Sequence, residues 1–146
     1  SELINFLIKN KAINIHMGVS PYYKGADCNF WSMYDLNNNL TGATIHLINK
    51  KLDSGPILYH AMSEKFDNPF IYSMSTVKSA VDSLVKKICD ESIFKIKPTL
   101  QKKNKLIRYS KKNQFTDEII IKFLKKKFRS QKIDKSKLIN PYILKK

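Results

Sequence analysis

The sequence predicts an α/β fold, a layered domain whose sheet is at least partly parallel. Short apolar segments typical of strands alternate along the chain with segments of helical periodicity, and this order is typical of the α/β class. The chain has 146 residues, of which 42% are hydrophobic, so its length and apolar content suit one domain with one core. In sheets of this class, functional sites form at the carboxyl ends of strands.

The first part of the chain is predicted to contain strands separated by helices and by a loop. The expected elements are a helix that ends near Asn10, strands at residues 12–16, 42–49 and 56–63, and a helix at residues 28–36 with Asp27 as its N-cap. Residues 17–25 contain four turn formers, Gly18, Ser20, Pro21 and Gly25. Such residues argue against regular structure, so we expect an irregular loop there.

The second part contains the strongest helix signal and a basic tail. Between residues 75 and 89, apolar residues recur at intervals of three and four, as on the buried face of a helix; they are Val77, Ala80, Val81, Leu84, Val85 and Ile88. Pro98 then interrupts the pattern. We therefore divide the chain into residues 1–97 and a basic tail, residues 98–146. The tail is expected to hold a short strand at residues 106–109 and a helix at residues 117–128, which Thr116 would cap.

The formal net charge of +15 raises the question of a polyanionic partner. Clustered Lys and Arg side chains can neutralise nucleic-acid phosphates. However, only two of the 27 basic residues are Arg, and proteins that recognise bases and phosphates usually rely on bidentate Arg. The abundance of Lys, Asn and Ile also fits a genome rich in A and T. We interpret the Lys runs as solvated surface, and a nucleic-acid partner is not expected.

Neither export nor membrane insertion is expected. No apolar run approaches the roughly 18 residues that a membrane helix requires, and no charged and apolar leader is visible. Cys28 and Cys89 are far apart and form no Cys-x-x-Cys pattern, which argues against a disulfide framework or a structural zinc site. We expect a soluble protein of the reducing cytoplasm that holds no metal.

Three polar residues form the candidate site. Asn14 and His16 lie two residues apart on the first predicted strand, so their side chains project from the same face, and His16 is the last residue of that strand. Asp53 follows in a Leu-Asp-Ser-Gly turn. If the fold brings the three side chains together, they form an acyl-transfer site. The alternative stays open that the pair caps an element or fixes a loop and that Asp53 bonds only its own turn.

Four short motifs occur in one order within residues 14–58. They are Asn-Ile-His at residues 14–16, Ser-Pro-Tyr-Tyr-Lys-Gly-Ala at residues 20–26, Thr-Gly-Ala-Thr-Ile-His at residues 41–46 and Leu-Asp-Ser-Gly-Pro-Ile-Leu at residues 52–58. Together they resemble the folate-dependent formyltransferase family, which includes glycinamide ribonucleotide transformylase, methionyl-tRNA formyltransferase and the sugar-nucleotide N-formyltransferases. The resemblance covers residues 12–97 and is nearest to the sugar-nucleotide branch. It implies a three-layer αβα, Rossmann-like fold with a mixed sheet, of which this chain holds only the C-terminal portion.

The resemblance also implies a reaction, the transfer of a formyl group from the co-substrate 10-formyltetrahydrofolate to a primary amine. In the family pattern, Asn14 would hold the oxyanion, His16 would shuttle the proton and Asp53 would orient or charge the histidine. An amide donor suits a tetrahedral oxyanion, and a histidine with an ordinary pKa of about 6.5 suits proton transfer at neutral pH. A carboxylate bonded to the imidazole favours its charged form and fixes its tautomer.

Further residues are expected to bind the two substrates. The folate would contact Leu52, Ser54 and Gly55, and the amine would contact Ser20, Tyr22, Tyr23, Lys24 and Gly25. His46 and His60 lie on predicted strands and are interpreted as structural or surface residues, while Trp31 is assigned to the core. Gly18 stands where the family often has a Ser, so no contact of that Ser is transferred to this position.

The short tail bears on the identity of the acceptor amine. Methionyl-tRNA formyltransferases append a further domain of on the order of 100 residues, and residues 98–146 are too few for one. We therefore expect a nucleotide-linked amino sugar, with methionyl-tRNA and glycinamide ribonucleotide as alternatives. The N-terminal half of the family's domain would come from the same chain or from a partner chain. In an alternative of another class, the chain is a non-catalytic truncated remnant or a basic binding module.

Overall fold

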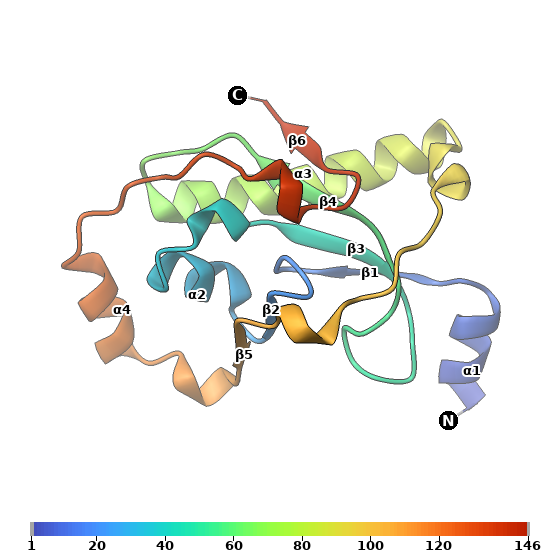
Figure 1. Ribbon diagram of the computed structural model, residues 1–146, viewed down its shortest axis with the longest axis horizontal. Helices are drawn as coiled ribbons and strands as arrows, with labels where there is room; N and C mark the ends of the chain where they lie inside the picture. The colour runs from blue at the N-terminus through green and yellow to red at the C-terminus, as the bar shows by residue number, and fades with distance from the viewer. Residues whose placement is uncertain (1, 146) are drawn as a thin grey trace.

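The computed structural model describes residues 2–145 (Figure 1). Within these residues the main sheet has four strands in the order β1-β3-β4-β6, and a second sheet pairs β2 with β5. The strands are β1 (Ile13–His16), β2 (Tyr23–Gly25), β3 (Ala43–Leu47), β4 (Ile57–Ser63), β5 (Arg108–Ser110) and β6 (Tyr142–Leu144). β3 is antiparallel to β1 and to β4, whereas β6 is parallel to β4 and β5 is parallel to β2. The predicted α/β class with a mixed, partly parallel sheet is confirmed.

Four α-helices are present among the described residues. They are α1 (Glu2–Lys9), α2 (Cys28–Tyr34), α3 (Pro69–Cys89) and α4 (Asp117–Leu124). Short 3-10 helices also occur, namely η1 (Asn38–Leu40), η2 (Ser92–Lys95), η3 (Lys103–Lys105), η4 (Lys112–Gln114) and η5 (Lys135–Lys137). Over residues 2–145, no helix has the length and apolar character needed to cross a membrane.

The longest helix, α3, begins at Pro69 rather than at residue 75. The side chain of Asn68 accepts hydrogen bonds from the backbone nitrogens of Phe70 and Ile71, at 2.9 and 3.1 Å, and Pro69 occupies the first turn. Both features favour a helix start. The six apolar residues that predict this helix do lie on it, but they do not form one buried face. Ala80 is fully buried, whereas Val81, Val85 and Ile88 are about half exposed.

Two strands are absent from the sequence-based prediction. β2 lies at the end of the segment where the sequence predicts an irregular loop; that prediction is right for residues 17–22 and wrong for residues 23–25. The strand forms because β5 supplies a parallel partner from the tail, with Tyr23 opposite Arg108 and Gly25 opposite Ser110. β6 likewise follows no local pattern and is added to the edge of β4. Strand formation at both places depends on tertiary context rather than on local propensity.

The two predicted N-caps occupy the right positions but make no capping bond through their side chains. Asp27 adopts a left-handed conformation with φ 54° and makes no such bond to α2. Thr116 donates its Oγ1 hydrogen to Glu118 instead. Aromatic packing joins the two helices, since Phe30 of α2 lies edge-to-face against Phe123 of α4 with ring centroids 5.2 Å apart.

The two faces of the main sheet differ in chemistry because successive residues of a strand point to opposite sides. The apolar face packs against α3 (Figure 1), and its core comprises Ile15, Ala43, Ile45, Tyr59 and Ala61 with Ala80 and Leu84 of the helix. Small residues of α3 bring it close to β4. Ser79 Oγ donates to the carbonyl oxygen of Met62, and Ser83 Oγ lies 3.0 Å from the hydroxyl of Tyr59.

Polar side chains occupy the opposite face of the sheet. They are Asn14, His16, Thr44, His46 and His60, which the strand register brings alongside one another. The segment that follows β1 covers them, since Ser20 N donates to Thr44 Oγ1 at 2.8 Å and Thr44 Oγ1 donates to the carbonyl oxygen of Gly18 at 2.6 Å. His60 donates to the carbonyl oxygen of Ser20 and accepts from the backbone nitrogen of Ile139, both at 2.9 Å. His60 is therefore a structural histidine, as predicted.

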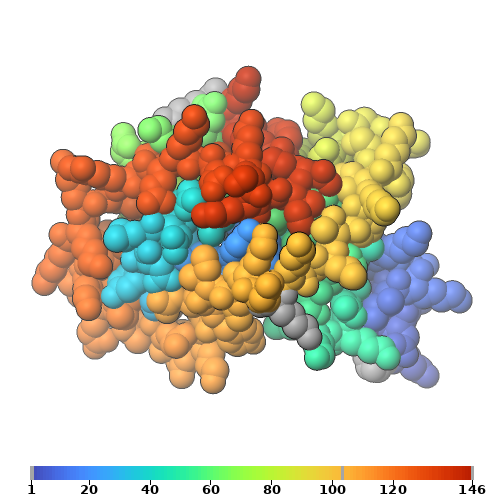
Figure 2. All heavy atoms as spheres, in the orientation of Figure 1, coloured from blue at the N-terminus to red at the C-terminus, as the bar shows by residue number. Residues whose placement is uncertain are grey.

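Arg108 attaches the tail to α2 and to the covering segment. Its Nε and Nη2 donate to the two carboxylate oxygens of Asp35, at 2.8 and 2.6 Å, and its guanidinium lies 4.4 Å from the ring centroid of Trp31. Asp35 also accepts a hydrogen bond from the hydroxyl of Tyr23. Figure 2 shows the tail, coloured orange to red, bordering α2 on this face of the molecule. The tail thus contributes to both sheets, and the domain boundary after residue 97 stays a prediction.

Replacing Arg108 with Gln should loosen the tail. Gln keeps a polar side chain but loses the charge and the bidentate geometry, so we expect the free energy of unfolding to fall by about 1–2 kcal/mol. Amide hydrogen exchange in β2 and β5 should become faster. Arg129→Gln, at the other arginine, serves as the control and should leave exchange in these strands unchanged. Equal exchange rates in the two variants would contradict the docking role of Arg108.

Candidate active site

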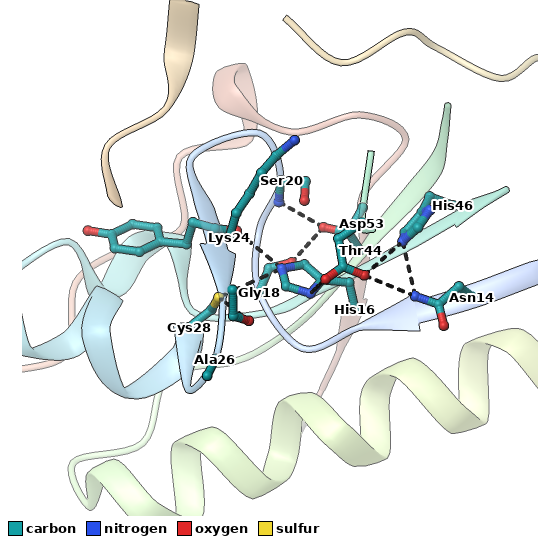
Figure 3. Close-up of polar contacts among 12 residues, drawn as sticks. Asn14, His16, Gly18, Ser20, Lys24, Ala26, Cys28, Thr44, His46 and Asp53 are labelled. Carbon is teal, nitrogen blue, oxygen red and sulfur yellow. Dashed lines mark hydrogen bonds and ion pairs between the residues drawn. The ribbon is translucent and has the colours of Figure 1, made fainter. Parts of the chain in front are cut away.

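The side chains of Asn14, His16 and Asp53 lie together on the polar face of the sheet (Figure 3). His16 Nδ1 is 3.4 Å from Asp53 Oδ2, and Asn14 Nδ2 donates to Asp53 Oδ1 at 3.3 Å. Asn14 and His16 belong to β1, while Asp53 comes from the connection between β3 and β4. The convergence on which the sequence-based hypothesis depends therefore occurs, with the Asp53 carboxylate as the shared acceptor.

His46 is a further member of this cluster. Its Nε2 is 3.1 Å from Asn14 Nδ2 and 3.7 Å from Asp53 Oδ1. Its Nδ1 is 2.8 Å from the carbonyl oxygen of Leu47, so Nδ1 carries the hydrogen and Nε2 accepts from Asn14. The sequence favours a structural or surface role for His46, and its 2% exposure and its contacts with Asn14 and Leu47 fit the structural one. The sequence does not reveal the register of the β1–β3 ladder, which places His46 directly opposite Asn14.

The neighbours of Asn14 decide how its amide is oriented. His46 Nε2 and Asp53 Oδ1 are both acceptors, so the NH2 group rather than the carbonyl oxygen faces them. Both amide hydrogens are committed in this state. An oxyanion can receive one of them only if Asn14 gives up a contact, and the contact with Asp53 is the longer of the two.

His16 is placed to carry a positive charge. Its Nε2 is 3.2 Å from the carbonyl oxygen of Tyr23 and its Nδ1 faces Asp53, so both ring nitrogens face acceptors. Burial lowers the pKa of His16, but hydrogen bonds and charge interactions with Asp53 and Cys28 outweigh burial and raise it to about 10. The hydrogen bond from His16 is the largest cause that holds the pKa of Asp53 well below its ordinary value. The site therefore contains an imidazolium and a carboxylate at neutral pH.

The turn that presents Asp53 is held from two sides. Asp53 has a left-handed φ of 47°, which Asp tolerates better than most residues. Gly55 allows the turn to approach β3, because a Cβ at this position would overlap the carbonyl oxygen of Leu47. Gln101 of the tail donates from Nε2 to the carbonyl oxygens of Asp53 and Gly55, at 3.0 and 2.8 Å. No pattern in the sequence marks Gln101, because this contact joins distant parts of the chain.

Two cavities adjoin the cluster and share no lining residue. One, of about 370 Å³, is lined by His16 and Cys28 together with apolar side chains of α2, α3 and α4. The other, of about 290 Å³, is lined by Asn14, His46 and Asp53 and by the neighbouring Leu52. Over residues 2–145, no group of three or more His, Cys, Asp or Glu side chains could hold a metal ion.

Comparison with known proteins gives the family. A formyl transferase family model matches residues 1–87, which is more than half of the chain. The chain belongs to the formyl transferase family. The formyltransferase PseJ from Anoxybacillus kamchatkensis, solved in complex with UDP-4,6-dideoxy-4-formamido-L-AltNAc and tetrahydrofolate, is 26% identical with a TM-score of 0.59. That match covers 77% of this chain and 58% of PseJ.

Two further formyltransferases show the same fold. A sugar N-formyltransferase from Shewanella sp. is 25% identical with a TM-score of 0.58, and the match covers 70% of this chain and 41% of that one. A 4-N formyltransferase from Francisella tularensis is 21% identical with a TM-score of 0.61, over 91% of this chain and 65% of that one. This formyl transferase chain thus spans less than two thirds of the length of each of these three proteins.

The residues predicted to bind the amine lie close to the cluster of Asn14, His16 and Asp53, but several are packed internally. The side chains of Ser20, Tyr22 and Tyr23 are buried. The Tyr22 hydroxyl donates to the carbonyl oxygen of Lys137, and the backbone of Tyr23 contacts His16. Gly25 lines the 370 Å³ cavity. Of the residues predicted to bind folate, Leu52 lines the 290 Å³ cavity, and Gly55 and Ser54 complete the turn that carries Asp53.

The charge state of His16 should be visible in a pH titration by NMR. We expect the ring signals of His16 to titrate near pH 10, whereas burial lowers the pKa of His60 to about 4. Because the pKa of His16 is higher in the folded chain than the ordinary 6.5, its stabilising contribution is full below about pH 6.5 and is lost as the pH rises toward 10. The Asp53→Asn variant should lose this dependence. A His16 signal that titrates near 6.5 in the unmodified chain would contradict the proposed ion pair.

Proposed function

We propose that this chain is the catalytic part of an N-formyltransferase that moves the formyl group of 10-formyltetrahydrofolate to a primary amine. The observation that carries this proposal is the Asn14, His16 and Asp53 cluster at the carboxyl end of β1, in a chain of the formyl transferase family. An amide donor, an imidazolium and a carboxylate are the groups that acyl transfer to an amine needs.

The geometry suggests how each residue acts. Attack of the amine on the formyl carbon forms a tetrahedral oxyanion, which the hydrogens of Asn14 and His16 would stabilise. Collapse of the intermediate breaks the bond to the folate nitrogen, and the His16 imidazolium supplies the proton that this nitrogen takes up. The imidazole then accepts the proton released by the new amide. Asp53 holds His16 in orientation throughout and favours its charged form.

The two cavities support a separate place for each substrate. The 290 Å³ cavity beside Leu52 and Asp53 is assigned to the folate, with Ser54 and Gly55 shaping its turn. The 370 Å³ cavity beside His16 is assigned to the amine, with Gly25 in its lining and Lys24 next to it along β2. The catalytic cluster lies between them, as a direct transfer requires. Contacts of the amine with Ser20, Tyr22 and Tyr23 would involve their backbone, because their side chains are buried.

A nucleotide-linked amino sugar is the proposed acceptor. PseJ, at 26% identity, was solved with a UDP-linked formamido sugar and tetrahydrofolate, which supports a sugar nucleotide and a folate as the substrate classes. Residues 98–145 fold back onto the sheets, to which they add the strands β5 and β6. We do not propose a nucleic-acid partner. The free thiols of Cys28 and Cys89 suit a reducing compartment, and we place this one-carbon transfer in the cytoplasm.

Activity is proposed to require the N-terminal half of the domain, in the same chain or in a partner chain. Among the described residues, no strand pairs with the outer edge of β1. α3 also presents an exposed apolar stripe, formed by Phe70, Met74, Val81, Val85 and Ile88. An open edge and an apolar helix face are surfaces on which another layer of the domain can pack.

A non-catalytic remnant is the second candidate, and the same open edge favours it. The coding sequence immediately upstream distinguishes the two. An in-frame segment that encodes alternating strands and helices supports the enzyme, and its absence together with no active partner chain supports the remnant.

Substitutions at the cluster test the mechanism in the complete protein. Asn14→Ala and His16→Ala should each lower kcat for formyl transfer by about 100- to 1000-fold, because each removes a donor to the oxyanion. Release of tetrahydrofolate measures the rate. Asn10→Ala is the matched control, since Asn10 is exposed and bonds only its own helix, through the carbonyl oxygen of Phe6. If both cluster variants retained the rate of the unmodified enzyme, the mechanism would be wrong.

The acceptor is tested by product mass. The complete protein, incubated with 10-formyltetrahydrofolate and a UDP- or dTDP-linked amino sugar, should add the mass of one formyl group to the sugar nucleotide. Methionyl-tRNA and glycinamide ribonucleotide serve as competing acceptors in parallel reactions. Formylation of methionyl-tRNA with no product on any sugar nucleotide would overturn the proposed substrate class.

A further inference from the structure

Cys28 is a buried nucleophile that formyl transfer does not use. It begins α2 and is 1% exposed, yet it lines the 370 Å³ cavity together with His16. Its Sγ is 3.7 Å from His16 Nε2 and 3.4 Å from the carbonyl oxygen of Gly25. Figure 3 shows the sulfur and the imidazole facing each other, with Asp53 on the far side of the ring. A thiol, an imidazole and a carboxylate thus lie in series.

The contact between the thiol and the imidazole depends on Gly18. A Cβ at this position would lie 2.5 Å from Cys28 Cβ and 2.8 Å from His16 Nε2. Any larger residue would therefore force the two side chains to move. Gly18 leaves the space that lets Cys28 and His16 meet at the wall of the cavity.

This arrangement favours reaction at sulfur. The nucleophile in thiol chemistry is the thiolate, and a neighbouring imidazolium stabilises that anion. The Asp53 carboxylate keeps His16 in its charged form, at 3.4 Å from the opposite ring nitrogen. The remaining walls of the cavity include the apolar Phe30, Met33 and Val77 and the acidic Asp27. Apolar walls suit small uncharged molecules, and an acidic side chain disfavours anionic ones.

We propose that Cys28 is a covalent modification site, at which small, uncharged, soft electrophiles that enter this cavity bond to Sγ and block His16. With a haloacetamide, the bond between Sγ and the methylene carbon forms, the carbon–halogen bond breaks, the halide leaves and the thiol proton passes to solvent. The adduct occupies the cavity next to His16 Nε2. This reactivity does not rest on the proposed formyl transfer, because it is measured by labelling rather than by turnover.

Limited alkylation of the native full chain with iodoacetamide tests the proposal. Peptide mass spectrometry follows Cys28 and Cys89 separately, and the exposed Cys89 is an internal control in every sample. Cys28 should be labelled in the native chain. The variants His16→Asn and Asp53→Asn should each slow labelling of Cys28 by about tenfold and leave Cys89 unchanged, because the first removes the imidazolium beside the thiol and the second removes the carboxylate that keeps this imidazolium charged. An unlabelled Cys28, or a rate unchanged in both variants, overturns the proposal.

Access through the cavity is tested with a matched pair on α3. Val77 lines the cavity, whereas Val85 is 55% exposed on the same helix and lies outside it. Val77→Trp should slow labelling of Cys28, and Val85→Trp should not. An unfolded variant would be labelled faster rather than slower, so loss of the fold cannot imitate the expected result. If Val77→Trp left the rate of Cys28 unchanged, the reagent would be reaching the thiol by another path and the proposed site would be wrong.

Discussion

The partly buried carboxylate of Asp53 is the group around which this structure is organised. Its side chain is 14% exposed, and a charge so placed is costly unless donors surround it. Asn14 donates to one oxygen and His16 faces the other, while His46 approaches from β3. Removing one of these neighbours would leave the Asp53 carboxylate with fewer favourable contacts. The buried charge is therefore compensated only when the whole cluster is assembled.

Assembly of the cluster requires segments that are far apart in the chain. β1 brings Asn14 and His16, and β3 brings His46 through an antiparallel ladder. The turn that carries Asp53 approaches β3 because Gly55 lacks a side chain, and Gln101 of the tail secures the same turn. The tail is thus part of the site's support rather than an appendage, and Arg108 links it to the segment whose Tyr23 backbone contacts His16.

The two faces of the main sheet differ in role, because successive side chains of a strand point to opposite faces. The apolar side packs against α3 around one hydrophobic cluster, whereas the other side carries the polar cluster and the structural His60. A second hydrophobic cluster, which includes Val19, Trp31 and Met62, lies apart from the first. This division leaves the imidazole of His16 between Asp53 and Cys28, in surroundings where burial alone would favour its neutral form. The hydrogen bonds and charges of these partners outweigh burial and keep His16 in its charged form.

The sequence by itself determined the α/β class, the main helices and strands, the family and the three polar residues that meet. These follow from periodicity within one segment and from motifs with fixed spacing, such as Asn14 and His16 two residues apart on a strand. Only the tertiary structure decided that β2 and β6 are strands, that His46 and Gln101 belong to the site, and that Cys28 reaches His16. Each of these depends on register or on contacts between distant segments, and such contacts leave no periodic pattern in the residues that make them.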